Sequence, residues 1–160
     1  MRCYLDSSAL LKRVIDEAET EDLRATLTMF VASGWSLVTS DLAQVEVMRA
    51  CRRGIVAGRL AGVNAAERFA IALGGVELHA IDARVIAEAG TVGGDQLRSL
   101  DAIHLATALL VDADMLITYD ERLLDACREA GMMTAQPGAL DATLPPGWEW
   151  VGEAPDVATA

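Results

Sequence analysis

Four acidic residues stand beside or inside apolar segments: Asp6, Glu46, Asp101 and Asp120. Two of them, Asp6 and Asp120, directly follow segments that are typical of buried strands. If the acids meet in space, each pair of like charges at ~4 Å costs about 4 kcal/mol at an effective dielectric constant near 20. Such a cluster must take up protons or bind cations. Because the donors are carboxylate oxygens without His or Cys, the expected ions are Mg²⁺ or Mn²⁺, which activate water and polarise phosphoryl oxygens.

Each acid also has an ordinary structural explanation. Asp6 and Asp120 can serve as turn or helix-capping residues. Glu46 can pair with Arg49 or Arg53 on an exposed helix face. Asp101 can complement the dipole at the start of its helix. These alternatives stay open for each residue taken alone. The positions of all four acids together favour a shared site.

The order of apolar segments predicts the α/β fold that would position these acids. Short strands are expected at residues 2–5, 36–39, 76–80, 115–119 and 132–135. Helices are expected between them: after Ser7 or Ser8, from Leu23 to near Gly34, from Ser40 to Gly58, from Asn64 to Gly74, from Asp82, from a Ser99 cap within Leu97–Leu110, and from Glu121 to Gly131. Strands that alternate with helices indicate a parallel sheet covered on both faces. Sites in such sheets form beyond the carboxyl ends of the strands, where Asp6 and Asp120 are expected to converge.

Length and composition indicate a single domain of the globular class. The chain has 160 residues, of which 52% are hydrophobic. All four prolines follow Ala135, so residues 1–135 are expected to form the domain and residues 136–160 an irregular acidic tail. The tail contains Trp148 and Trp150, which either remain in a disordered segment or dock on the domain.

Charge and cysteine content exclude several classes. A net charge of −11 argues against purely electrostatic binding of nucleic acid, but it is compatible with an acidic cluster that needs cations. The longest uncharged run, residues 25–40, has sixteen residues, too few to span a membrane. The apolar run before Asp6 has only three residues, Cys3, Tyr4 and Leu5, which leaves no room for the apolar region of a signal peptide. Three cysteines without CxxC spacing indicate buried thiols in the cytoplasm.

Four segments together resemble the motifs of a known family: YLDSSALLK, QVEVMRA, LRSLDAIHLATAL and ITYDERL. In order and spacing they are similar to the motifs of PIN-domain ribonucleases, and most similar to VapC-type toxins of toxin–antitoxin pairs. The similarity covers about residues 2–135. It implies a three-layer α/β/α domain with a central, mostly parallel sheet, which uses Mg²⁺ or Mn²⁺ to hydrolyse RNA phosphodiester bonds. It also implies a homodimer and a cognate VapB-like antitoxin that silences the enzyme.

Carried over to this sequence, the resemblance assigns roles to six residues. The catalytic and metal-binding acids are Asp6, Glu46, Asp101 and Asp120, with Ser8 and Thr118 in supporting positions. His104, three residues after Asp101, is expected to be a core residue or to lie behind the site rather than to act as a base. One alternative is a non-catalytic PIN-like interaction module, which would lack one or more of the acids. Another is a different Mg²⁺-dependent phosphohydrolase; one with an aspartyl nucleophile would normally carry D-x-D, with an acid at position 8.

Overall fold

The computed structural model describes residues 1–56 and 64–139, which build a five-stranded sheet covered by helices. The strands are β1 (Arg2–Leu5), β2 (Ser36–Ser40), β3 (Val76–His79), β4 (Met115–Ile117) and β5 (Thr134–Ala135). Their order across the sheet is β3-β2-β1-β4-β5, and each neighbouring pair is parallel. The sheet predicted from the sequence is therefore confirmed, with β1 at its centre.

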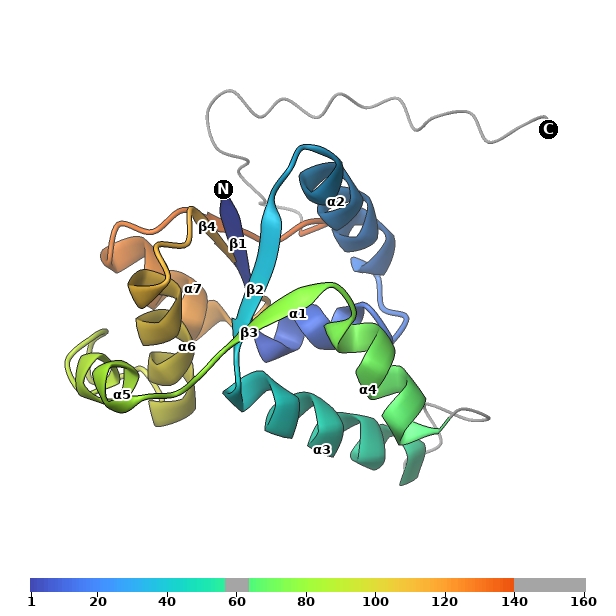
Figure 1. Ribbon diagram of the computed structural model, residues 1–160, viewed down its shortest axis with the longest axis horizontal. Helices are drawn as coiled ribbons and strands as arrows, with labels where there is room; N and C mark the ends of the chain where they lie inside the picture. Colours follow the sequence, from blue (N-terminus) through green and yellow to red (C-terminus); the bar gives the residue numbers. More distant parts are fainter. Residues whose placement is uncertain (57–63, 140–160) are drawn as a thin grey trace.

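Helices form a layer on each side of this sheet. They are α1 (Ser7–Lys12), α2 (Thr20–Ala32), α3 (Leu42–Val56), α4 (Ala65–Leu73), α5 (Ala83–Ala89), α6 (Ser99–Leu110) and α7 (Glu121–Glu129). In Figure 1, α1 to α4 lie on one side of the sheet, while α6 and α7 lie on the other side with α5 packed along α6. The fold is the expected three-layer α/β/α arrangement.

Alternation along the strands fills both layers of the core. Cys3 and Leu5 of β1 pack into the cluster on the α1–α4 side, whereas Tyr4 between them packs against α6 and α7. All three side chains are fully buried. A strand whose side chains are buried on both faces belongs in the interior of a parallel sheet. This alternation also directs the Tyr4 hydroxyl toward α6.

The structure decides between the caps that the sequence offered for α1, which were Asp6 and the serines at positions 7 and 8. Asp6 is the N-cap residue, with an extended backbone (φ −78°, ψ 177°), and its side chain accepts the N–H of Ala9. Ser7 and Ser8 are the first residues of the helix rather than its caps. Asp and Ser are nearly equivalent as N-caps, so the residue types could not separate these positions.

Two other helix starts are also shifted. Ser40 is the last residue of β2 rather than the cap of α3, because the strand extends one residue beyond the predicted segment. α6 begins at Ser99 with Arg98 as its N-cap, so Ser99 is a helical residue and not the cap. The predicted cap at Asn64 is confirmed, since its side chain accepts the N–H of Ala66 at 2.8 Å.

The first residues of the predicted tail contact the domain. The hydroxyl of Tyr119 donates to the carbonyl of Pro137 at 2.9 Å. Residues 140–160, with Trp148 and Trp150, and the predicted helix stop at Gly58 lie outside the described residues. None of the helices within the described ranges is long and apolar enough to cross a bilayer.

Candidate active site

Parallel pairing of β1 with β4 brings two of the predicted residues together. Leu5 is in register with Ile117, and the backbone N–H of Asp6 donates to the Ile117 carbonyl at 3.3 Å. The residues that follow the two strands are consequently neighbours, and Thr118 Oγ1 donates to Asp6 Oδ2 at 2.7 Å. Two positions later, Asp120 caps α7.

Hydroxyl groups hold the buried carboxylate of Asp6. Ser8 Oγ lies 2.7 Å and 2.9 Å from its two oxygens, and Ser8 itself accepts the backbone N–H of Tyr119 at 2.8 Å. Thr118 Oγ1 in turn accepts the N–H of Asp120 at 3.0 Å. Each hydroxyl thus connects Asp6 to a backbone N–H of the β4–α7 connection. These contacts are of the kind expected of supporting residues at positions 8 and 118.

The environment of Asp6 still disfavours its charge. Burial raises the pKa of this carboxyl above its ordinary value of 3.8, against the lowering influence of His104 and of the hydrogen bonds from Ala9, Ser8 and Thr118. At Asp6 the effect of burial therefore outweighs the combined effect of His104 and of the hydrogen-bond donors.

Glu46 of α3 is anchored through one oxygen. Its Oε2 accepts a short hydrogen bond from Ser7 Oγ and lies 2.9 Å from His104 Nε2. Burial by itself raises the pKa of Glu46, but the hydrogen bonds from His104 and Ser7 outweigh it and leave the pKa below its ordinary value. Oε1 makes no hydrogen bond with the described residues.

Asp101, in the first turn of α6, has the least compensated carboxylate. Its Oδ2 is buried and has no hydrogen-bond partner among the described residues. Burial and the nearby charge of Asp120 raise the pKa of Asp101, His104 and Arg98 lower it in part, and Asp6 raises it further. An unpartnered buried oxygen of this kind is rare in proteins and indicates a missing ligand, water or ion.

Asp120 combines a structural and a candidate chemical role. Its Oδ1 accepts the backbone N–H groups of Arg122 at 2.9 Å and Leu123 at 3.3 Å, which caps α7. Its Oδ2 makes no hydrogen bond within the described part of the chain. The capping explanation is therefore correct for Asp120, as it is for Asp6, and does not exclude a place in the site.

One cavity of about 330 Å³ collects all four predicted acids. It is lined by Asp6, Ser7, Ser8, Glu46, Arg98, Ser99, Leu100, Asp101, His104 and Asp120. Among the lining residues, Arg98 is the only Lys or Arg. The structure thus places the four acids from the ends of β1 and β4 and the starts of α3 and α6 at one surface depression.

The donor set fits a hard divalent cation. The four acids offer carboxylate oxygens alone, and Asp101 Oδ2 is buried with no partner among the residues that the structure describes. Within residues 1–56 and 64–139, however, no three His, Cys, Asp or Glu side chains already lie close enough to hold an ion. The metal-binding role of the acids accordingly remains a prediction.

Sequence reasoning did not single out Tyr4 and Ser7. Ser7 is adjacent to Asp6 and reaches Glu46, while Tyr4 reaches His104 from β1. The apolar run within residues 2–5 predicted a short buried strand but gave no indication of a polar partner for Tyr4. His104 is buried behind the site, as expected.

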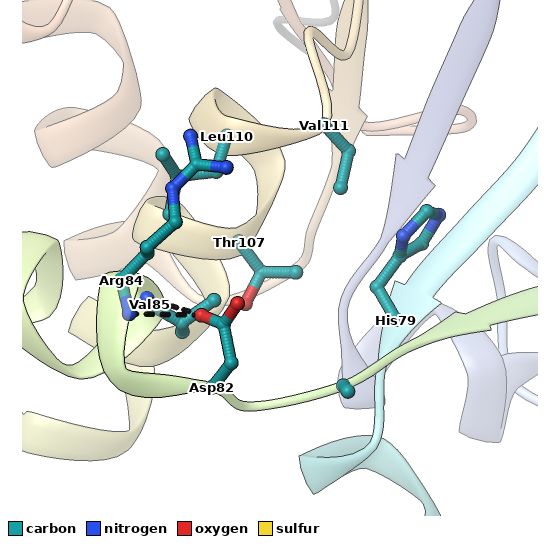
Figure 2. A pocket seen from close by; sticks show the side chains of 8 residues that line it. His79, Asp82, Arg84, Val85, Thr107, Leu110 and Val111 are labelled. Atoms are coloured by element: carbon teal, nitrogen blue, oxygen red, sulfur yellow. Dashed lines mark hydrogen bonds between the residues drawn. The ribbon is translucent and has the colours of Figure 1, made fainter.

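A second cavity, of about 250 Å³, lies between the end of β3 and the helices α5 and α6. Figure 2 shows Asp82 at the start of α5, where its Oδ1 accepts the N–H groups of Arg84 and Val85 at 2.9 and 3.0 Å. His79 lies across the cavity from Asp82. With one carboxylate, already engaged as a helix cap, this cavity is a weaker candidate for metal-dependent chemistry.

The sheet order and the acids gathered at its carboxyl edge define a class of protein. The family model of the PIN domain matches residues 3–129, and the chain belongs to the PIN-domain family. Among its relatives, Ribonuclease VapC47 of Mycobacterium tuberculosis (strain CDC 1551 / Oshkosh) is 42% identical over 139 residues, which cover 86% of this chain and 98% of the relative. Ribonuclease VapC46 of Mycobacterium tuberculosis (strain ATCC 25618 / H37Rv) is 40% identical over 136 residues, covering 84% and 96%. The VapC-type membership indicated by the sequence motifs is confirmed.

Solved structures with low sequence identity share the fold. VapBC2 from Rickettsia felis, bound to a DNA fragment from its promoter, aligns with a TM-score of 0.60 at 12% identity over 84% of this chain and 97% of the matched chain. The Mycobacterium tuberculosis toxin VapC20, which cleaves the sarcin–ricin loop, aligns with a TM-score of 0.58 at 15% identity over 78% and 94%. These likenesses support the fold assignment.

Proposed function

We propose that this chain is an Mg²⁺- or Mn²⁺-dependent endoribonuclease that hydrolyses RNA phosphodiester bonds with a metal-activated water. It acts as the toxin of a type II toxin–antitoxin pair. The observation that carries the proposal is the single cavity lined by Asp6, Glu46, Asp101 and Asp120 in a PIN-domain chain. Support also comes from two relatives with 42% and 40% identity, both named as ribonucleases.

The four acids would hold the metal. Asp6 and Asp101 are the principal ligands, and Glu46 and Asp120 complete the set directly or through water. When bound, the ion supplies positive charge for the phosphodiester and lowers the pKa of a water that attacks it. The positive charge of the ion would also allow a chain whose net charge is −11 to bind a polyanionic substrate.

Side chains around the acids fix their orientation and protonation. Ser8 and Thr118 hold Asp6 through hydrogen bonds of 2.7 Å to its two oxygens. The lowered pKa of Glu46 makes it a weak proton acceptor. Asp120 also offers an oxygen, Oδ2, that has no partner within the described residues and can accept the proton of the attacking water.

The proposed partners follow from the family. A VapB-like antitoxin and a second copy of the chain are expected, and two structural neighbours are VapBC assemblies, one of them from nontypeable Haemophilus influenzae (TM-score 0.55, 14% identity, 86% of this chain and 98% of the matched chain). An RNA substrate and free, buried thiols at Cys3, Cys51 and Cys127 are compatible with action in the cytoplasm. Residues 1–135 would form the nuclease domain, and 136–160 the tail.

Cleavage of a panel of structured RNAs, with Mn²⁺ and with EDTA, tests the proposal. We expect internal cleavage by the wild type in Mn²⁺ and a loss of at least about 100-fold in Asp6→Asn and Asp101→Asn, because each removes a charged ligand. Asp125→Asn is the matched control, since it neutralises an exposed acid on α7 whose side chain is 70% exposed. Cleavage that survives EDTA, or that both site variants retain, would contradict the mechanism and favour another phosphohydrolase or an interaction module.

A further inference from the structure

A buried hydrogen-bond chain runs from the core of the domain to Glu46. The backbone N–H of Ser40 donates to the Tyr4 hydroxyl at 3.2 Å, and this hydroxyl lies 2.8 Å from His104 Nδ1. The other ring nitrogen, Nε2, lies 2.9 Å from Glu46 Oε2. Ser7 Oγ donates to the same glutamate oxygen. This series of hydrogen bonds connects β1, β2, α6 and α3 at the floor of the cavity.

The first two members are almost completely removed from water. Tyr4 is 0% exposed and His104 is 2% exposed, and their rings meet edge to face, with centroids 5.8 Å apart. Because neither side chain can exchange its partner for water, their hydrogen bonds are obligatory rather than incidental. His104 therefore has one environment, set by Tyr4 on one side and Glu46 on the other.

The directions of the hydrogen bonds select one tautomer of His104. At neutral pH a tyrosine hydroxyl carries its proton, and a glutamate carboxylate can only accept hydrogen bonds. Because Glu46 Oε2 can only accept, the hydrogen between it and His104 belongs to Nε2; a neutral ring is then bare at Nδ1 and receives the hydroxyl proton of Tyr4. Nδ1 then acts as an acceptor, which leaves the proton of the ring on Nε2, facing Glu46.

We infer that His104 is a positioning residue for the proposed nuclease reaction: oriented by Tyr4, its Nε2–H fixes Glu46 Oε2 and leaves Oε1 for the cavity. This inference rests on the proposed function for its catalytic consequence. Its structural part, the tautomer and the Glu46 contact, stands on the geometry alone. His104 does not act as a base here, because its donor is already committed to Glu46 and its acceptor to Tyr4.

These contacts hold the Glu46 carboxylate in one orientation. Ser7 and His104 both donate to Oε2, while Oε1 makes no hydrogen bond with the described residues. One oxygen is thus an anchor, and the other is available to a metal or a water. Hydrogen-bonded partners of ligating carboxylates typically change metal affinity or activity by about 10- to 100-fold when removed.

The tautomer can be measured independently of any activity. The chain has two histidines, so long-range ¹H–¹⁵N correlation spectra need only His79→Gln to assign both rings. We expect a bare Nδ1 and a protonated Nε2 for His104, and a mixture of tautomers in Tyr4→Phe, which keeps the ring but removes the hydroxyl. A wild-type protein with the proton on Nδ1 would overturn the inference.

Kinetics test the coupling to Glu46. We expect His104→Leu to lower kcat for RNA cleavage by about 10- to 100-fold with little change in KM, since a residue that is 2% exposed does not touch RNA. His104→Gln keeps an N–H donor and should recover part of the lost kcat. Tyr4→Phe should lower kcat roughly 2- to 10-fold. His79→Gln should leave kcat unchanged. Introduced into Glu46→Gln, His104→Leu should add no further loss.

The nuclease proposal and the role inferred for His104 can fail independently of each other. If His104→Leu costs as much in the Glu46→Gln background as in the wild type, His104 acts independently of Glu46 and the inference is wrong. If the wild type cleaves no RNA, the nuclease proposal fails, and the nitrogen spectra alone still decide whether Tyr4 and His104 hold Glu46 as described.

Discussion

The four carboxylates of the cavity differ in how far the protein compensates their charge. Asp6 receives hydrogen bonds at both oxygens, and Glu46 receives them at one. Asp101 has a buried oxygen that finds no partner in the described part of the chain, and it lies close enough to Asp120 for that charge to raise its pKa. In the absence of a cation, the charge of Asp101 therefore opposes folding, and no hydrogen bond from the described residues at Oδ2 offsets it.

Removing that charge should stabilise the protein while abolishing its activity. For Asp101→Asn we expect the free energy of unfolding in EDTA at pH 7 to rise by about 1 kcal/mol, because like-charge repulsion and an unpaired buried charge are both relieved. For a domain of this size, that corresponds to roughly 2–4 °C in Tm. Scanning calorimetry of the two proteins in EDTA measures the difference.

The difference in stability between Asp101→Asn and the wild type should become smaller as the pH is lowered. The folded state raises the pKa of Asp101 above its ordinary value of 3.8, so the folded state binds a proton more tightly than the unfolded state. The cost of the charge is complete above the raised pKa and disappears as the pH falls toward 3.8. The Tm advantage of Asp101→Asn should shrink over that interval. A variant that is less stable than the wild type at pH 7, or an advantage equal to that of Asp125→Asn, would contradict the assignment.

At the scale of elements, helix starts supply much of the site. Asp6 caps α1 and Asp120 caps α7, while Asp101 lies in the first turn of α6. Carboxylates at these positions are favoured by the helix dipole and by free N–H groups. The fold thus places acids at one edge through local capping interactions, which partly offset their mutual repulsion.

Capping and chemistry can be separated at Asp120. Asp120→Ser keeps an oxygen that accepts the N–H groups of α7 but removes the carboxylate, whereas Asp120→Ala removes both. We expect Asp120→Ala to lose about 1 kcal/mol of stability and Asp120→Ser to lose little, with RNA cleavage impaired in both. Urea unfolding and the cleavage assay give the two readouts. Equal loss of stability in both variants would show that the cap at this position does not depend on a side-chain oxygen.

Elements and acids were predictable from the sequence for different reasons. The strands and helices follow from periodicity, and Asp6 and Asp101 stand out because charge interrupts an apolar pattern. The cap of α1 was not predictable, because Asp6, Ser7 and Ser8 all favour that position and the pairing of β1 with β4 decides among them. The contact of Tyr4 with His104 joins residues 100 positions apart, and no local pattern encodes it.

At the scale of the whole molecule, the charge balance becomes part of the mechanism. A net charge of −11 repels RNA at a distance, and the cavity concentrates four of the contributing carboxylates at the point where RNA would bind. Divalent ions would reverse the local sign without altering the rest of the surface. Binding of the ion and binding of RNA should therefore be coupled, with the acids as the common element.

That coupling predicts a specific stabilisation by metal. Mn²⁺ at about 100 times its Kd should add about 2.7 kcal/mol to the free energy of unfolding, because the ion binds only the folded site. NaCl at matched ionic strength controls for general screening of an acidic protein. EDTA should reverse the Mn²⁺ effect, and Asp101→Asn should reduce it to the NaCl level. Compared with the wild type, Asp101→Asn should therefore have a higher Tm in EDTA but a smaller increase in Tm when Mn²⁺ is added. A Tm that rises equally in Mn²⁺ and NaCl, or equally in both proteins, would mean that the acids repel one another without forming a metal site, and the ion-dependent mechanism would have to be abandoned.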